Sequence, residues 1–211
     1  KIGVLNDMSG LYADLAGPGS VIAAQMAIED SGLTKKGWKI DVVSADHQNK
    51  PDVGVNIARQ WIDVDKVDVV ADVPTSSVAL AVSNLVKEKN SIMLNSGAGS
   101  SDLTNKACTP NTIHWTYDTY TLAHGTGTAL TKSPAAAGAA GGKIVGAVKH
   151  PLTTADFSSF LLQAQASKAK VIGLANAGGD TVNAIKQAAE FGITTGGQKL
   201  ASLLMFISDV H

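Results

Sequence analysis

The sequence has one cysteine, few aromatic residues and no long hydrophobic run. The single cysteine, Cys108, excludes a disulfide within these 211 residues and a zinc site built from several cysteines. No apolar stretch approaches the roughly 20 residues that a membrane-spanning helix needs. Basic and acidic side chains nearly balance, at 17 against 18, and no Lys/Arg cluster is interleaved with aromatic residues. We therefore expect no nucleic-acid partner, because no net positive field attracts phosphates.

The motifs that mark common enzyme classes are also missing. Neither of the phosphate-binding patterns G-x-G-x-x-G and G-x-x-x-x-G-K-[ST] occurs, so no nucleotide cofactor is expected. A G-x-S-x-G elbow and an H-E-x-x-H metal motif are absent as well. The histidines are scattered without metal-ligand spacing: His47, His114, His124, His150 and His211. We expect no enzyme, and predict no catalytic residue, metal ligand or cofactor.

Short apolar, β-branched runs alternate with segments of helical period. The expected strands are Ile2–Leu5, Ile40–Ser44, Val67–Asp72, Ile92–Asn95, Ile144–Val148, Val171–Ala175 and Leu203–Ile207. The expected helices are Ser20–Asp30, Val53–Ile62, Ser77–Lys89, Phe157–Ala166 and Thr181–Phe191. Such alternation predicts an α/β fold in which helices flank parallel sheets on both faces.

The predicted elements fall into two lobes. Residues 1–118 are expected to form a compact N-terminal ligand-binding lobe, and residues 119–202 part of a C-terminal lobe. Within the second lobe, residues 133–142 are almost entirely Ala and Gly, which is typical of a linker or a gap rather than a core. Residues 203–211 are expected to form a strand and the start of a crossover back to the first lobe. The second lobe is therefore expected to be incomplete in this chain.

Two turns at neighbouring strand ends are candidates for binding a small anion. Val73–Ser77 follows the third expected strand and Asn95–Ser100 follows the fourth. Both turns offer small hydroxyl residues and bare backbone N–H groups, which suit a carboxylate at a helix start. The alternative for each turn is structural, with Ser76 only a helix N-cap and the glycines only turn residues. The first turn, Asp7–Gly10, has no lysine to reach a phosphate.

The run His114–Tyr120 joins the two expected lobes and is rich in aromatic residues. Aromatic side chains with polar tips can wall a ligand cleft and hydrogen-bond a ligand. They can equally pack as a hinge. The chain begins at Lys1, directly on a strand-like run, which fits either a secreted protein whose signal peptide has been removed or a trimmed chain.

An ordered set of segments carries a family resemblance. It comprises Ile2–Gly10, Ala45–Pro51, Thr75–Ser77, Asn95–Gly99, His114–Asp118, Asp156–Ser158 and Asn176–Asp180. In this order the segments resemble the branched-chain amino-acid-binding proteins, which are type I periplasmic solute-binding proteins of ABC importers. The resemblance implies two α/β lobes of the Venus-flytrap type that close on a small solute.

The resemblance also implies which residues contact the solute. The first lobe would hold a ligand carboxylate, and the second lobe would contribute the turn at Asn176 and the loop reaching Asp209. The predicted ligand-binding residues are Tyr12, Ser76, Ser77, Ser96, Gly97, Ala98, Gly99, Tyr117, Asn176, Gly178 and Asp209. Amino-acid binders often carry an aromatic residue where this chain has Gly178, and Asp209 only approximately matches the acidic residue that holds a ligand amine. A roomier pocket for an aromatic or other organic acid is therefore an alternative to a branched-chain amino acid.

These considerations lead to a functional expectation. We expect a monomeric, periplasmic solute-binding protein that delivers an amino acid, an amide or an organic acid to the membrane subunits of an ABC permease. A ligand-sensing regulator or receptor domain of the same fold is the second hypothesis. An α/β enzyme with a cofactor is the third, and the missing phosphate loop counts against it.

Overall fold

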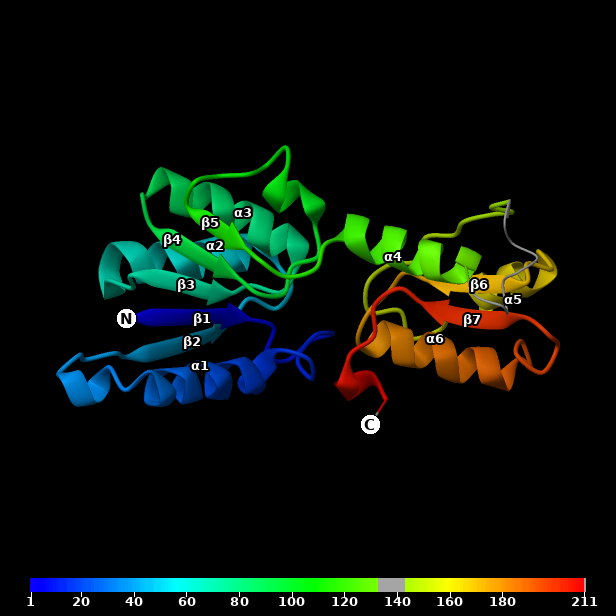
Figure 1. Cartoon of the computed structure of the whole chain (residues 1–211), viewed down its shortest axis with the longest axis horizontal. Coiled ribbons are helices and arrows are strands. Elements are labelled where there is room, and N and C mark those ends of the chain that lie inside the picture. Colours follow the sequence, from blue (N-terminus) through cyan, green and yellow to red (C-terminus); the bar gives the residue numbers. More distant parts are fainter. Residues whose placement is uncertain (133–142, 211) are drawn as a thin grey trace. The chain divides into compact units, whose positions relative to one another are not determined.

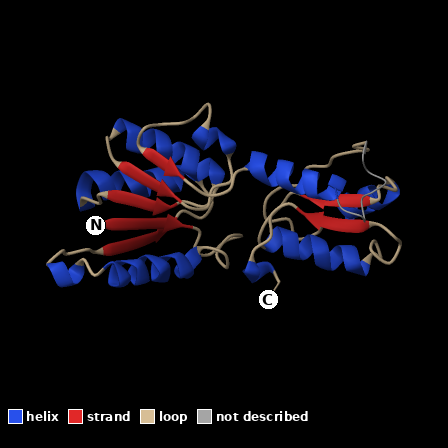
Figure 2. Ribbon diagram, viewed as in Figure 1, coloured by secondary structure: helices blue, strands red, loops and turns tan. Residues whose placement is uncertain are grey.

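A computed structural model describes residues 1–132 and 143–210 of the chain. The chain divides into two compact units, Lys1–Thr119 and Tyr120–His211. In each unit, helices flank a parallel sheet (Figures 1 and 2). The predicted linker or gap at 133–142 lies outside the described residues, as does His211.

The first unit contains a five-stranded sheet in the order β2-β1-β3-β4-β5, with every neighbouring pair parallel. The strands are β1 (Ile2–Asn6), β2 (Val42–Asp46), β3 (Val69–Asp72), β4 (Ile92–Asn95) and β5 (Thr112–His114). From β1 the chain crosses to β2 on one side, whereas β3 lies on the other side of β1. Ligands of open parallel sheets bind outside the carboxyl ends of the strands near such a reversal.

The helices of the first unit are α1 (Gly17–Ser31), α2 (Pro51–Gln60) and α3 (Ser76–Glu88), with short turns η1 (Thr34–Lys36), η2 (Trp61–Asp65) and η3 (Ser101–Thr104). Helix α2 starts with a proline, whose fixed φ suits the first helical position, and has Asp52 in its first turn. Along α3, Val78, Val82 and Val86 recur every fourth residue and are fully buried. This spacing places them on one face of the helix, which packs against α2 and the sheet.

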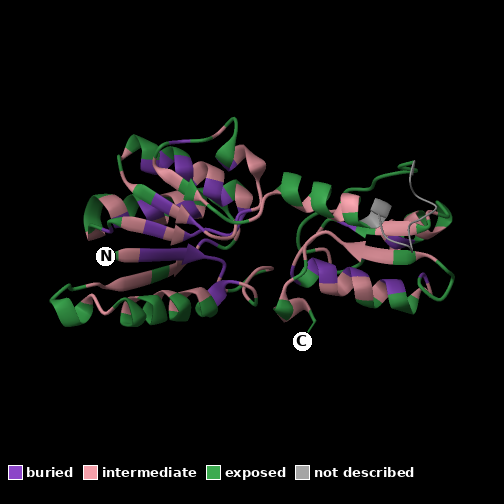
Figure 3. Cartoon of the chain, in the orientation of Figure 1, coloured by how far each residue is buried: buried purple, intermediate pink, exposed green. Residues whose placement is uncertain are grey.

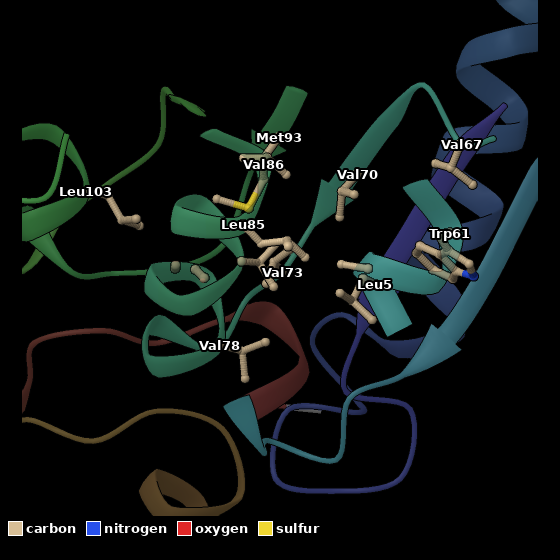
Figure 4. Packing of buried hydrophobic residues seen from close by; sticks show 14 residues of the cluster. Leu5, Trp61, Val67, Val70, Val73, Val78, Leu85, Val86, Met93 and Leu103 are labelled. Atoms are coloured by element: carbon tan, nitrogen blue, oxygen red, sulfur yellow. The ribbon is translucent and has the colours of Figure 1, made fainter. Parts of the chain in front are cut away.

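The core of the first unit lies between the sheet and the pair α2 and α3 (Figure 4). Leu5, Val70 and Met93 point into it from three neighbouring strands and are fully buried. Fully burying such a side chain contributes about 1.5–3 kcal/mol. Trp61 packs over β1 so closely that a Cβ at Gly3 would lie 2.5 Å from its ring. Only glycine fits at position 3 without moving that ring.

The second unit is smaller in its described residues. It contains strands β6 (Val171–Leu174) and β7 (Lys199–Ser202), helices α4 (Thr119–Lys132), α5 (Ser158–Ala166) and α6 (Gly179–Glu190), and the turn η5 (Ile207–Asp209). A separate apolar cluster comprises Phe157, Leu161, Leu174, Ala184, Ala188 and Ile193. Buried residues are correspondingly fewer in this unit than in the first (Figure 3). None of the described helices is both long enough and apolar enough to span a bilayer.

Several predicted elements are wrong in detail. Residues 144–148 form no strand, and Ile144 is 86% exposed. The strand expected at 203–207 lies instead at Lys199–Ser202, where it pairs with β6, and residues 207–209 form the turn η5. The short strand β5 and the helix α4 were not predicted. Strand β5 has only three residues and its central Ile113 is 52% exposed, so it carries no apolar run.

Candidate ligand-binding site

The junction between β3 and α3 exposes free backbone donors. Thr75 is the N-cap residue and Ser76 is the first helical residue, so the alternative that Ser76 is only an N-cap is wrong. No side chain caps this 13-residue helix. Among the described residues, the backbone N–H groups of Ser76, Ser77 and Val78 have no hydrogen-bond partner. Ser77 is exposed and Ser76 half-buried, so an anion can approach their N–H groups and the positive end of the helix dipole, whereas Val78 is fully buried.

The turn after β4 is fixed by its side chains to the turn after β3. The side-chain Nδ2 of Asn95 donates to the carbonyl oxygens of Asp72 and Val73, at 3.0 and 2.9 Å. Its Oδ1 accepts the N–H of Ala98 at 3.0 Å. Asn95 is fully buried, which makes these bonds costly to break. One asparagine therefore sets the spacing of both turns.

The carbonyl groups of the β4 turn are anchored by the last residue of β5 and by a residue that follows it. Tyr117 Oη donates to the carbonyl oxygen of Gly97 at 2.9 Å, and His114 Nε2 lies 2.6 Å from that of Ala98. The described chain has no cis peptide, so the N–H of Gly99 points opposite to the Ala98 carbonyl. The N–H groups of Gly97 and Gly99 have no partner among the described residues. The turn thus engages its acceptors internally and leaves two donors free.

The two turns touch directly. The backbone N–H of Ser100 donates to Ser76 Oγ at 3.2 Å, which leaves the hydroxyl proton of Ser76 available to another acceptor. A Cβ at Gly97 would lie 2.9 Å from Cβ of Pro74, so glycine is required for this approach. The structure therefore brings together Ser76, Gly97 and Gly99, all predicted site residues.

A buried carboxylate that the sequence analysis did not single out lies behind these turns. Asp72, at the end of β3, is 9% exposed and accepts hydrogen bonds from Asn6 Nδ2 at 3.1 Å and Ser96 Oγ at 2.7 Å. The hydroxyl proton of Ser96 is therefore already committed to Asp72. The sequence does contain a pattern that could have predicted this role of Asp72, namely an acidic residue at the carboxyl end of an apolar strand.

Two tyrosines belong to the same region. Tyr12 lies in the turn after β1, where its backbone N–H donates to Asp7 Oδ2 at 2.8 Å. Burial raises the pKa of Tyr117, and the negative charges of ionised Tyr12 and of Asp72 raise it further. Tyr12 is thus close enough to Tyr117 to influence its ionisation. At neutral pH the Tyr117 phenol is a hydrogen-bond donor.

In the second unit, Asn176 and Gly178 lie between β6 and α6. Asn176 Oδ1 accepts the hydroxyl of Thr181 at 3.0 Å, and Gly178 has a φ of 59°, which favours glycine. Asp180, just inside α6, is 1% exposed and accepts the backbone N–H groups of Thr153 and Thr154. Burial raises the pKa of Asp180. This carboxylate holds the 153–154 turn against the start of α6.

Asp209 has a local role in η5. Its Oδ2 accepts the backbone N–H of Phe206 at 2.9 Å. This bond satisfies a donor at the start of the turn. Asp209 therefore has less capacity left to hold a ligand amine, although a carboxylate can accept several bonds.

No group of three or more His, Cys, Asp or Glu side chains suited to a metal ion occurs in the described ranges 1–132 and 143–210. What the first unit offers is a set of backbone donors and hydroxyl groups around the ends of β3 and β4. Such a set can hold a carboxylate.

Comparison with known proteins identifies the family. The sequence model of a periplasmic binding protein family matches residues 1–135 and 131–211. The chain belongs to this periplasmic binding protein family. A periplasmic binding protein from Burkholderia mallei has 49% sequence identity, and the match covers 100% of this chain and 62% of that one, with a TM-score of 0.91.

Two further solved members are less similar to this chain. A branched-chain amino acid ABC transporter periplasmic ligand-binding protein from Burkholderia xenovorans LB400 is 38% identical over 99% of this chain and 62% of that one, with a TM-score of 0.78. An ABC transporter solute-binding protein from Rhodopseudomonas palustris BisB5, in complex with 3,4-dihydroxybenzoic acid, is 26% identical, with 95% and 61% covered and a TM-score of 0.75. A search of curated proteins finds no match.

These matches confirm the predicted resemblance and the predicted fold class, that of the two-lobed type I periplasmic binding proteins. The chain spans about three fifths of the length of the solved relatives it matches, 62% for the Burkholderia mallei protein. The described part of the second unit, with its two strands, is accordingly a partial lobe.

Proposed function

We propose that this chain is the ligand-binding part of an extracytoplasmic solute-binding protein of an ABC importer, and that its solute carries a carboxylate. The observation that carries the proposal is the uncapped start of α3 beside the free N–H groups of Gly97 and Gly99. The carboxylate would accept these backbone donors and the hydroxyl of Ser76. Hydrogen bonds to a charged group contribute about 1.5–3 kcal/mol each, roughly twice the neutral value.

The position of the donors favours a carboxylate over a neutral group. Backbone donors at a helix start need no reorganisation when the anion arrives, and the dipole of α3 adds a favourable field. The Asp72 carboxylate, at the back of the turns, accepts hydrogen bonds from Asn6 and Ser96. These bonds stabilise the Asp72 carboxylate without using the donors of α3. The predicted residues Ser77 and Tyr12 would line the same position, whereas Ala98 is fully buried and its N–H and carbonyl groups are bonded to Asn95 and His114.

The class of solute is an amino acid, an amide or an aromatic or other organic acid. The Burkholderia xenovorans relative is named for branched-chain amino acids, and the Rhodopseudomonas palustris relative holds 3,4-dihydroxybenzoic acid. Both ligand types carry a carboxylate, which supports a shared anchor. Gly178 lacks a side chain, which would leave room for an aromatic ring. Asn176, Tyr117 and Asp209 would contribute polar contacts.

The mechanism would be binding without chemistry. A solute that contacts both lobes shifts an open–closed equilibrium toward the closed state by its additional contacts there. The closed protein, a monomer in the periplasm, would present the solute to the membrane subunits of the permease. No enzymatic step is required.

The experiment is calorimetric titration of the intact protein with benzoate, 3,4-dihydroxybenzoate and leucine, and with the uncharged analogue benzamide. We expect at least one carboxylate to bind and benzamide to bind far more weakly than benzoate. Ser76→Ala should lower the carboxylate affinity roughly 10-fold, because one hydrogen bond to a charged group is lost. Ser44→Ala, at an exposed serine on β2, is the matched control. Equal affinity of S76A and wild type would remove Ser76 from the site.

A further inference from the structure

The N-cap residue of α3 turns its side chain away from the helix. Thr75 has the extended backbone expected of an N-cap, with φ −84° and ψ 117°, and is 4% exposed. A threonine here ordinarily accepts the N–H of the second or third helical residue, Ser77 or Val78. Instead its hydroxyl donates to Oδ1 of Asn49, which lies in the turn after β2.

A buried carboxylate fixes the orientation of the Asn49 amide. Asn49 Nδ2 donates to Asp7 Oδ2 at 2.5 Å, and Asp7 is fully buried. An ionised carboxylate only accepts hydrogen bonds, so the NH₂ group of Asn49 must face Asp7 and the carbonyl oxygen must face Thr75. The same carboxylate accepts the N–H groups of Gly10 and Tyr12, both at 2.8 Å. Asp7, Asn49 and Thr75 thus form one directed chain from the β1 turn to the start of α3.

The backbone of Asn49 is held as firmly as its side chain. Its φ is 57°, in the left-handed region where asparagine is one of the few residues tolerated readily. Its N–H donates to Nδ1 of His47 at 3.0 Å. Asn49 therefore cannot follow Thr75 if the hydroxyl rotates toward the helix.

We propose that Asn49 is a positioning residue for the carboxylate site. By accepting the Thr75 hydroxyl, Asn49 holds the Thr75 side chain away from the first turn of α3, so Thr75 does not cap the helix and the exposed N–H group of Ser77 remains free for the solute. This inference rests on the proposed function, since it assigns that donor to the solute carboxylate. Alanine in place of an N-cap threonine weakens a helix by about 1 kcal/mol, so α3 forgoes stabilisation of that order.

The proposal predicts rescue by a second substitution. Asn49→Ala frees the Thr75 hydroxyl to cap α3 and to compete with the solute, so the affinity for benzoate or leucine should fall roughly 5- to 10-fold, the equivalent of one cap. Adding Thr75→Val removes the competing hydroxyl. The double variant N49A/T75V should then bind the same probe at least about threefold more tightly than N49A. Asn90→Ala is the matched control, since Asn90 also has a left-handed φ, 50°, and is exposed at the other end of α3.

A purely structural role for Asn49 gives the opposite result. In that case N49A/T75V binds no more tightly than N49A, because the second substitution only adds damage, and the proposal is overturned. Amide hydrogen exchange supplies a readout without ligand. The amides of Ser77 and Val78 should exchange more slowly in N49A than in wild type or in N49A/T75V. Unchanged exchange in N49A overturns the inference by itself. A wild-type protein that binds no carboxylate instead overturns the proposed function.

Discussion

His114 Nε2 lies 2.6 Å from the carbonyl oxygen of Ala98, so a residue at the end of β5 fixes a peptide in the turn after β4. A carbonyl oxygen can only accept, so Nε2 carries the proton in this contact. The bond determines which way the Ala98–Gly99 peptide faces. His114 therefore controls a donor of the candidate site without contacting the solute itself.

Replacement of His114 by alanine should weaken carboxylate binding. Loss of the bond to Ala98 releases the peptide and removes a preoriented donor, which we expect to lower affinity about fivefold, or ~1 kcal/mol. His114→Gln retains an N–H donor on a side chain of similar reach and should retain part of the affinity. His124→Ala, at an exposed residue of α4, is the control. Calorimetric titration with benzoate measures the affinity of all three variants. An H114A variant that binds benzoate as tightly as wild type would show that the turn does not need the His114 bond.

Tyr117 should remain a hydrogen-bond donor well into the alkaline range. Burial raises its pKa above the ordinary 10.0, with further contributions from Tyr12 and Asp72. The protonated form is favoured in the folded state, so its contribution to stability is complete below pH 10 and is lost as pH rises through the higher folded pKa. An ultraviolet difference titration of wild type against Tyr117→Phe should show one phenol ionising above pH 10. A difference spectrum that appears below pH 10 would contradict the raised pKa.

The positions of most elements in the first unit could be predicted because its core is built from strong apolar periodicities. The apolar runs at β1 and β4 bury side chains in this core. In α3, apolar residues at every fourth position do the same on one face of the helix. Strand β5 could not be found in this way, since Ile113 is exposed and its neighbours are polar. In the second unit the apolar run at 203–207 predicted a strand at the wrong place. The observed strand is Lys199–Ser202, which pairs with β6 and is less apolar than that run.

The candidate site could be predicted only in part. Parallel strands deliver their carboxyl ends to one edge of a sheet, so the meeting of the turns at Ser76 and Gly97 followed from topology. The direction of each hydrogen bond did not. That Ser96 donates to Asp72, and that Thr75 turns away from its own helix, depends on side-chain rotamers and on partners distant in sequence. The assignment of ligand-binding residues stays a prediction.

Gly54→Ala should lower the free energy of unfolding of the first unit and disturb the start of α3. A Cβ at Gly54 in α2 would lie 2.5 Å from Cγ1 of Val78, so α2 and α3 would have to move apart. Such overpacking typically costs about 1–3 kcal/mol. Because Val78 lies in the first turn of α3, carboxylate affinity should fall as well. Gly19→Ala, where an added Cβ meets nothing within 4 Å, should leave both quantities nearly unchanged in urea unfolding and calorimetry.

Mild acid should destabilise the first unit through His47. This residue is fully buried, and burial lowers its pKa below the ordinary 6.5, against the opposing effect of Asp7, Asp46 and Asp72. Its Nδ1 accepts the N–H of Asn49 at 3.0 Å, so protonation of Nδ1 would break that bond. The unfolded chain takes up a proton near pH 6.5 and the folded chain only at lower pH. Stability is therefore complete above about pH 6.5 and falls with pH toward the lower folded pKa.

Urea unfolding of the intact protein at pH 7.5 and pH 5.0 measures this effect. The midpoint should fall at pH 5.0 in wild type, and His47→Asn should reduce that fall because an asparagine oxygen can accept from Asn49 without titrating. The variant is expected to be less stable than wild type at pH 7.5, since a smaller side chain leaves a cavity. His124→Asn, at an exposed position, should preserve the wild-type pH dependence. If H47N lost as much stability in acid as wild type, another group would have to take up the proton. In that case His47 would still be neutral at pH 5.0, and its Nδ1 would still accept the backbone N–H of Asn49 and hold the β2 turn against the start of α3.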